Sequence, residues 1–151
     1  MVMLLHAANL NEFFREVLSD LQCQEDTQAY IIGIFGKYRT ATYDLSHYSV
    51  GALFAQARSN HSFFDYQSLG DFIFWQSTVN PENFQHASKD YYDTIAQLSY
   101  DACYQLINRQ WKLYQELADA LPQLEDQVKH RLTTISKESV LLEPNIFLCD
   151  D

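Results

Sequence analysis

The sequence predicts an all-α protein, a single-domain bundle of about six helices with an extended C-terminal tail. Three observations support this prediction. The 151 residues suffice for one sizeable core, apolar residues recur at helical spacing along most of the chain, and there are only 4 Gly and 3 Pro. Turn-rich all-β folds use more of these two residues. We therefore expect one helical domain over residues 1–151.

Two helices are predicted in the N-terminal quarter of the chain. The first begins at an asparagine cap, Asn9, because Glu12 follows at the spacing of a capping box. The second begins near Asp26. Its apolar segment could also form a strand, since β-branched and aromatic residues favour strands, but no second strand is predicted to pair with it. The expected buried positions are Leu10, Phe13, Phe14, Val17, Leu18 and Leu21, then Ile31, Ile34, Phe35 and Tyr38.

The next two predicted helices differ in the width of their apolar faces. The third has a narrow stripe and begins near Val50. The fourth runs from about Phe63 to Gln76 and is apolar nearly all round, which is typical of a helix buried on most sides. A turn at Asn80-Pro81-Glu82 ends it. The stripes contain Val50, Leu53, Phe54 and Ala57 in the third helix, and Leu69, Phe72, Ile73, Phe74 and Trp75 in the fourth.

Two longer helical patterns follow the turn. The fifth helix is predicted from about Ser88 to Asn108, and the sixth begins near Arg109. Pro122 must kink the sixth helix or split it in two, because proline lacks the amide proton and clashes with the preceding turn. The faces expected to be buried are Tyr91, Ile95, Leu98, Ala102 and Leu106, then Trp111, Tyr114, Leu117, Leu121, Leu124, Val128, Leu132 and Ile135.

Residues 139–151 are predicted to form the extended tail. Pro144 prevents one continuous helix through this segment. Its apolar residues would leave a contiguous hydrophobic surface in water if the segment were free. We therefore expect the tail to dock, either on its own bundle or across a two-fold axis on a partner subunit.

Charge indicates which classes of partner the protein can bind, and cysteine usage indicates its cellular compartment. Asp and Glu number 20 against 10 Lys and Arg, and the resulting net charge of -10 repels nucleic acid and anionic lipid surfaces. The 3 cysteines form no C-x-x-C pair, which is typical of a reducing compartment. No apolar run approaches the roughly 18 residues of a membrane span. We expect a cytoplasmic protein without nucleic-acid or membrane partners.

Three short motifs follow one another in the middle of the chain. They are Leu69-Gly70-Asp71 in a hydrophobic helix, the turn Asn80-Pro81-Glu82-Asn83-Phe84, and Asp90-Tyr91-Tyr92 at the start of a long helix with a further tyrosine, Tyr100 or Tyr104. This order resembles that of small uncharacterised bacterial helical proteins, whose last helix begins like Glu116-Leu117-Ala118. Two departures are Gln76-Ser77-Thr78, where the family has a small residue, and Pro122. The resemblance implies an all-α bacterial protein and no established activity.

Asp71 is the principal candidate for a functional group, because it directly precedes four large apolar residues. An ionised carboxylate in such a setting is costly unless it accepts hydrogen bonds. The phenols of Tyr91 and Tyr92 are the nearest expected donors on the next helix. In the structural interpretation, Asp71 joins the fourth helix to the fifth. In the functional interpretation, it is a pocket carboxylate with a raised pKa.

The functional interpretation predicts a ligand pocket between the fourth and fifth helices. Convergent polar groups in an aromatic setting are typical of small-molecule sites between helices. The expected lining is Asp71, Trp75, His86, Tyr91 and Tyr92.

Catalytic and metal-binding motifs are missing from the sequence. There is neither a Gly-rich nucleotide loop nor a nucleophile elbow. His61 with Asp65, and His86 with both Glu82 and Asp90, have the spacing of ligands on one helix face. Solvated pairing on a helix surface is the more common arrangement for such residues. We expect no catalytic residue, no metal and no cofactor.

Two functional hypotheses from different classes follow. The favoured one is a non-catalytic protein-interaction or regulatory module, which binds a protein partner or forms a homodimer. It rests on the missing catalytic motifs and on the surplus of large apolar residues. The alternative is a small-ligand-binding protein or enzyme with a pocket around Asp71, Tyr91 and Tyr92.

Overall fold

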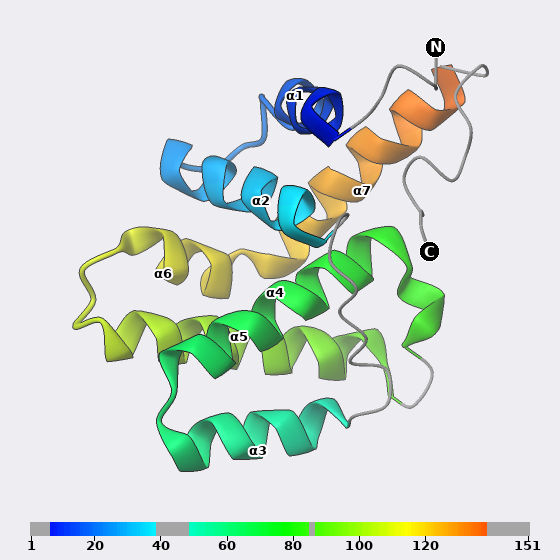
Figure 1. Cartoon of the computed structure of the whole chain (residues 1–151). Helices are drawn as coiled ribbons and strands as arrows, with labels where there is room; N and C mark the ends of the chain where they lie inside the picture. The colour runs from blue at the N-terminus through cyan, green and yellow to red at the C-terminus, as the bar shows by residue number, and fades with distance from the viewer. Residues whose placement is uncertain (1–6, 39–48, 85–86, 139–151) are drawn as a thin grey trace.

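The computed structural model describes residues 7–38, 49–84 and 87–138, and these residues form an all-α bundle (Figure 1). The described ranges contain seven α-helices, one 3-10 helix and no strand. The predicted fold class is therefore confirmed. The helices are α1 (Ala7–Val17), α2 (Glu25–Tyr38), α3 (Val50–Asn60), α4 (Phe63–Val79), η2 (Pro81–Asn83), α5 (Lys89–Leu106), α6 (Lys112–Asp119) and α7 (Leu121–Glu138).

Serine caps set the beginnings of three central helices. The side chains of Ser49, Ser62 and Ser88 accept hydrogen bonds from backbone N–H groups three residues further on, at the starts of α3, α4 and α5. Each cap satisfies one of the backbone donors that have no partner within the helix. The helices begin at Val50, Phe63 and Lys89, in agreement with the approximate starts predicted near Val50, Phe63 and Ser88.

Helix α4 is the central element of the fold. It packs against α2, α3, α5 and α7, with its most extensive contact to α5, and it crosses the middle of the bundle in Figure 1. Its buried residues lie all round the helix, as the sequence predicted. They are Tyr66, Leu69, Gly70, Asp71, Phe72, Ile73, Phe74, Gln76, Ser77 and Thr78.

The predicted inner face of α5 is wrong. Of its five residues, Ile95 alone is buried, whereas Tyr91, Leu98 and Leu106 are exposed over more than 40% of their surface. The face that packs on the core is richer in polar residues. It consists of Tyr92, Asp93, Ile95, Ala96, Ser99, Tyr100, Cys103 and Tyr104. Hydrogen bonds within the core offset the cost of burying polar groups. A prediction from the spacing of apolar residues cannot detect this, because it treats polar residues as exposed.

Pro122 splits the predicted sixth helix in two. Helix α6 ends at Asp119, Ala120 leaves the helical conformation, and α7 begins at Leu121. Pro122 therefore lies in the first turn of α7, where its missing N–H breaks no hydrogen bond. This division adds a seventh helix to the six expected. Trp111, predicted to be buried in this segment, precedes α6 and is 60% exposed.

Two further findings concern the predicted tail and the membrane. The predicted tail, residues 139–151, lies outside the described residues. Across the ranges that are described, no helix is both long and apolar enough to cross a bilayer.

Candidate functional site

Asp71 accepts hydrogen bonds from tyrosines on two other helices. The Tyr30 hydroxyl on α2 donates to the Asp71 carboxylate, at 2.8 Å from Oδ1 and 3.0 Å from Oδ2. The Tyr100 hydroxyl on α5 donates to Oδ1 at 2.7 Å. Asp71 is only 4% exposed. The carboxylate therefore joins α4 to α2 and α5, and tyrosine donors replace the water that it loses on burial.

Gly70 makes room for one of these donors. A Cβ atom at Gly70 would lie 2.9 Å from two ring atoms of Tyr100, which is closer than real Cβ contacts. The ring of Tyr100 therefore lies against the backbone of α4, and its hydroxyl reaches the carboxylate of the next residue. This arrangement gives the Leu69-Gly70-Asp71 motif a physical explanation, because glycine admits the tyrosine that aspartate binds.

The hydrogen-bond network continues from Tyr30 to α6. The hydroxyl groups of Tyr30 and Tyr114 interact, and their rings meet edge to face with centroids 5.4 Å apart. Gln67 Nε2 on α4 donates to the Tyr114 hydroxyl at 2.7 Å. Asp71, Tyr30, Tyr100, Tyr114 and Gln67, here called the tyrosine network, thus connect α2, α4, α5 and α6.

Burial changes the acidity of this network. It raises the pKa of Asp71 to about 6, although hydrogen bonds from Tyr100 and Tyr30 and the charge of Lys37 lower it in part. Burial and the charge of Asp71 also raise the pKa values of Tyr30 and Tyr100 far above the usual phenol range. Both phenols therefore remain protonated donors at neutral pH. Their hydroxyls are held by the carboxylate, which is typical of structural polar groups in a closed core.

Tyr91 and Tyr92, two further residues of the predicted pocket, make other contacts than to Asp71. Tyr92 stacks on Phe84 with ring centroids 3.9 Å apart. Tyr92 comes eight residues before Tyr100, about 12 Å away along the helix axis. Tyr91 is 42% exposed, and its hydroxyl lies close to Gly51 of α3. The prediction that Tyr91 and Tyr92 are the donors to Asp71 is therefore wrong.

Trp75, another residue of the predicted pocket, packs against α2. Trp75 packs edge to face on Phe35 and stacks on Tyr38, with centroid distances of 5.1 and 6.1 Å. These contacts join α4 to α2 on the helix surface beyond the tyrosine network. His86 lies outside the described residues. Sequence reasoning named Tyr100 only as a motif residue, and no pattern pointed to Tyr30.

A second buried polar cluster joins α5 to α7, and sequence reasoning missed it. The Lys89 ammonium contacts Asp93 Oδ2 at 2.5 Å and Glu125 Oε1 at 3.2 Å. Glu125 is fully buried and Asp93 is 5% exposed. The two signals in the sequence were the Lys89–Asp93 spacing of four residues and the position of Glu125 within the apolar stripe of α7.

Glu125 and Asp93 form a carboxyl pair that holds a proton. Burial, a hydrogen bond with Asp93 and the negative charge of Asp93 raise the pKa of Glu125 to about 8, against the opposing effect of Lys89. Glu125 is therefore mostly neutral at pH 7. The remaining oxygens, Asp93 Oδ1 and Glu125 Oε2, are buried and have no hydrogen-bond partner among the described residues. Two adjacent carboxylates in low dielectric cannot both ionise at low cost.

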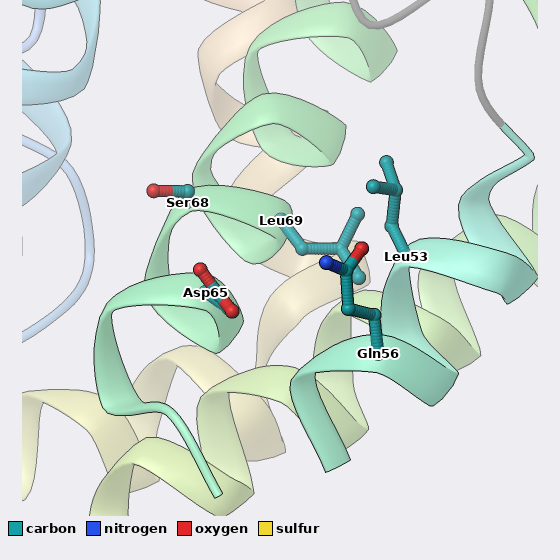
Figure 2. Close-up of a pocket in the computed structure, with 5 residues that line it drawn as sticks. All are labelled: Leu53, Gln56, Asp65, Ser68 and Leu69. Atoms are coloured by element: carbon teal, nitrogen blue, oxygen red, sulfur yellow. The ribbon is translucent and has the colours of Figure 1, made fainter. Parts of the chain in front are cut away.

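The surface contains a small groove between α3 and α4. Figure 2 shows Leu53 and Gln56 of α3 opposite Leu69 of α4, with Asp65 and Ser68 on the same stretch of α4. Its volume is about 190 Å³, below the roughly 300–1,000 Å³ of typical ligand sites. Asp71 does not line this groove. Among the described residues, no cluster of three or more His, Cys, Asp or Glu side chains could hold a metal ion.

The chain was compared with known proteins. No family model matches it, and no curated protein and no solved structure is significantly similar to it. The resemblance to small bacterial helical proteins therefore rests on the motifs quoted above.

Removing a donor to Asp71 should destabilise the protein. Tyr100→Phe leaves the buried carboxylate short of a hydrogen bond, which costs about 1–3 kcal/mol in free energy of unfolding. Tyr91→Phe is the matched control, because it removes a phenol from the same helix without touching Asp71, and it should change stability by less than about 0.5 kcal/mol. Urea denaturation measures the free energy of unfolding of both variants. Equal losses in the two variants would contradict the assignment of donors.

Adding a methyl group at Gly70 should also destabilise the fold. Alanine is the better helix former by about 1 kcal/mol, but the Cβ of Gly70→Ala would clash with the fully buried ring of Tyr100, at a cost of about 1–3 kcal/mol. Gly33→Ala on α2 is the control, since no atom lies within 4 Å of a Cβ there. We expect the control to raise the thermal melting temperature and Gly70→Ala to lower it.

The proton on Glu125 should make stability depend on pH. The folded pKa of about 8 exceeds the ordinary value of 4.5, so the proton on Glu125 favours the folded state. Its contribution to the free energy of unfolding is fully present below about pH 4.5 and is lost as the pH rises through 8. Glu125→Gln cannot ionise. The stability of this variant relative to the parent should therefore increase from pH 4.5 to 8, by up to about 1.4 kcal/mol per pH unit.

Chemical denaturation at several pH values measures this difference. Asp126→Asn is the control, because it makes the same acid-to-amide substitution at an exposed neighbour of the buried pair. A constant difference between Glu125→Gln and the parent across this range would show that Glu125 holds no proton.

Proposed function

We propose that the protein is a non-catalytic interaction module of the bacterial cytoplasm, and that α5 presents its binding surface. The observation that supports this proposal is an exposed apolar stripe on α5. Four residues, here called the α5 stripe, form it: Tyr91, Leu98, Ala102 and Leu106. Their exposed fractions are 42% for Tyr91, 47% for Leu98 and 41% for Leu106, and Ala102 is half-buried.

The spacing of these residues places them on one side of the helix. At 100° per residue, Tyr91, Leu98, Ala102 and Leu106 fall within an arc of about 80°. Ile95 lies in the same arc but is buried in the bundle, so it does not belong to the exposed stripe. Monomeric proteins rarely expose contiguous apolar surface of this kind outside interaction sites.

The same spacing indicates the form of the partner. From Tyr91 through Leu98 and Ala102 to Leu106, the steps are seven, four and four residues. Residues at these spacings share one side of a helix and can pack together against another helix. A helix from the partner is therefore the element that best fits the α5 stripe.

The groups with perturbed acidity support a binding role over a catalytic one. Shifted pKa values can mark active sites. In this protein, Asp71 is paired with Tyr30 and Tyr100, and Glu125 is paired with Lys89 and Asp93. These pairs explain the shifts within the core of the described residues. No observation there specifically favours the alternative, a small-ligand site around Asp71, Tyr91 and Tyr92.

Affinity capture with matched variants tests the proposal. Leu98→Glu places a charge at the centre of the α5 stripe, whereas Phe64→Glu places one on α4 at a side chain that is 69% exposed. A tagged full-length chain and the Phe64→Glu variant should retain the same partner from cytoplasmic lysate. The Leu98→Glu variant should lose it, by about tenfold or more. Equal recovery by all three chains would contradict a role for the α5 stripe.

A further inference from the structure

We infer that the tyrosine network and Trp111 carry an oxidising equivalent from the surface to the buried phenol of Tyr100, which holds it as a neutral radical beside Asp71. The oxidant is a one-electron oxidant in solution, of the metal-centred or peroxide-derived class. This activity does not depend on the α5 stripe. It draws on the contacts between aromatic rings, on the hydrogen bond from Tyr100 to Asp71 and on the exposure of Trp111.

Aromatic rings in contact form a path from solvent to the buried carboxylate. Trp111 is 60% exposed and stacks on Tyr114, with ring centroids 6.4 Å apart and an angle of 18° between the ring planes. The ring centroid of Tyr114 lies 6.4 Å from that of Tyr100. Indole and phenol are the aromatic side chains that one-electron oxidants attack most easily, and rings in contact exchange electrons readily. Trp111 is therefore the entrance of the path, and Tyr100 is its end.

The end of the path has a base for the phenolic proton. The Tyr100 hydroxyl donates to Asp71 Oδ1 at 2.7 Å, which is within the range for proton transfer to a positioned base. A phenol that loses an electron alone becomes a cation, and a cation is costly in a core. Transfer of the proton to Asp71 leaves a neutral phenoxyl radical and a neutral carboxylic acid. Because Tyr100 is fully buried, solvent does not reach the radical.

Electron and proton balance in each step. The oxidant takes one electron from the Trp111 indole and is itself reduced by one electron. Tyr100 then supplies one electron to the indole radical cation through the ring of Tyr114. In the same step the O–H bond of Tyr100 breaks, and its proton bonds to Asp71 Oδ1. Trp111 is thereby restored. A one-electron reductant in solution reverses the oxidation of Tyr100, and the proton returns from Asp71 to the phenol oxygen.

Asp71 is a stronger base than an ordinary carboxylate. Burial raises its pKa from 3.8 to about 6, so at pH 7 it is ionised and can accept the proton. Among the described residues, no charged group of α3 or α7 alters this pKa. The ionisable groups that face Asp71 come from three helices, and they are Tyr30 and Lys37 on α2, Tyr100 and Cys103 on α5, and Tyr114 on α6.

Cys103, a thiol beside the path, remains in its unreactive form. It is fully buried, and its Sγ lies 3.8 Å from the Phe63 carbonyl oxygen, to which the S–H group donates. Burial and the negative charge of Asp71 raise the pKa of the thiol far above its usual range. Cys103 is therefore protonated at neutral pH, whereas the thiolate is the form that reacts readily. The radical on Tyr100 thus has no thiolate beside it.

Flash photolysis of the full-length chain tests the inference. Gln110→Cys introduces a thiol next to Trp111 for the attachment of a ruthenium polypyridyl complex, and Cys23→Ser with Cys149→Ser prevents labelling at those sites. A quencher in solution oxidises the excited complex, which then acts as a one-electron oxidant beside Trp111. We expect transient absorption to show an indole radical, followed by a phenoxyl radical. An indole radical that decays without forming a phenoxyl radical would overturn the inference.

Variants of the labelled chain identify the path. Trp111→Phe should remove the rapid formation of the phenoxyl radical, because the complex does not oxidise phenylalanine. Asp71→Asn should slow it by about 100-fold or more, since the variant lacks the proton acceptor. Tyr104→Phe is the matched control, because Tyr104 is a buried phenol one turn after Tyr100 on α5 that does not bond to Asp71. An unchanged rate in Asp71→Asn, or loss of the radical in Tyr104→Phe, would contradict the inference.

The pH dependence tests the role of Asp71 without a substitution in the core. Protonated Asp71 cannot accept the phenolic proton, so the rate of phenoxyl formation should fall about tenfold between about pH 7.5 and pH 5, in proportion to the ionised fraction of Asp71. Tyr100→Phe should lower the yield of the radical more than Tyr30→Phe does, with circular dichroism confirming that both variants are folded. A rate independent of pH, or a larger loss in Tyr30→Phe, would overturn the assignment.

Discussion

The hydrogen bonds between the buried carboxylate of Asp71 and two tyrosines are the interaction on which the fold depends. Asp71 lies at the centre of the most buried helix, where a free carboxylate would be costly. The phenols of Tyr30 and Tyr100 compensate for that cost, and each comes from a different helix. The positions of α2 and α5 relative to α4 are therefore tied to a geometry that apolar contacts alone would leave loosely specified.

The same requirement explains the two unusual faces of α5. Its inner face carries Tyr100, Ser99 and Asp93, because the core contains polar groups on α4 and α7 that need partners. Its outer face carries Tyr91, Leu98 and Leu106, which are exposed in the described part of the bundle. This exposed stripe is the surface to which we assign the proposed binding role.

Asp71 and Glu125 are both buried carboxyl groups, and the cost of burying a charge is avoided in a different way at each. Asp71 is held by neutral donors. Glu125 retains a proton beside Asp93, and Lys89 contacts both carboxyl groups from the surface. The first solution fixes helix positions by hydrogen bonds, and the second links the packing of α5 on α7 to pH.

The sequence by itself determined the fold class and the approximate positions of the helices, because periodicity acts over a few residues. It located an interruption at Pro122 but left open whether the helix is kinked or divided there, and Asn9, its predicted cap, lies within α1. It also pointed to Asp71, since a carboxylate beside large apolar residues is a local anomaly. Only the tertiary structure decided which phenols bind Asp71, that Glu125 meets Asp93, and which face of α5 is exposed. Each of these depends on helices separated by many residues, and the choice among several tyrosines follows from the packing of α5 on Gly70.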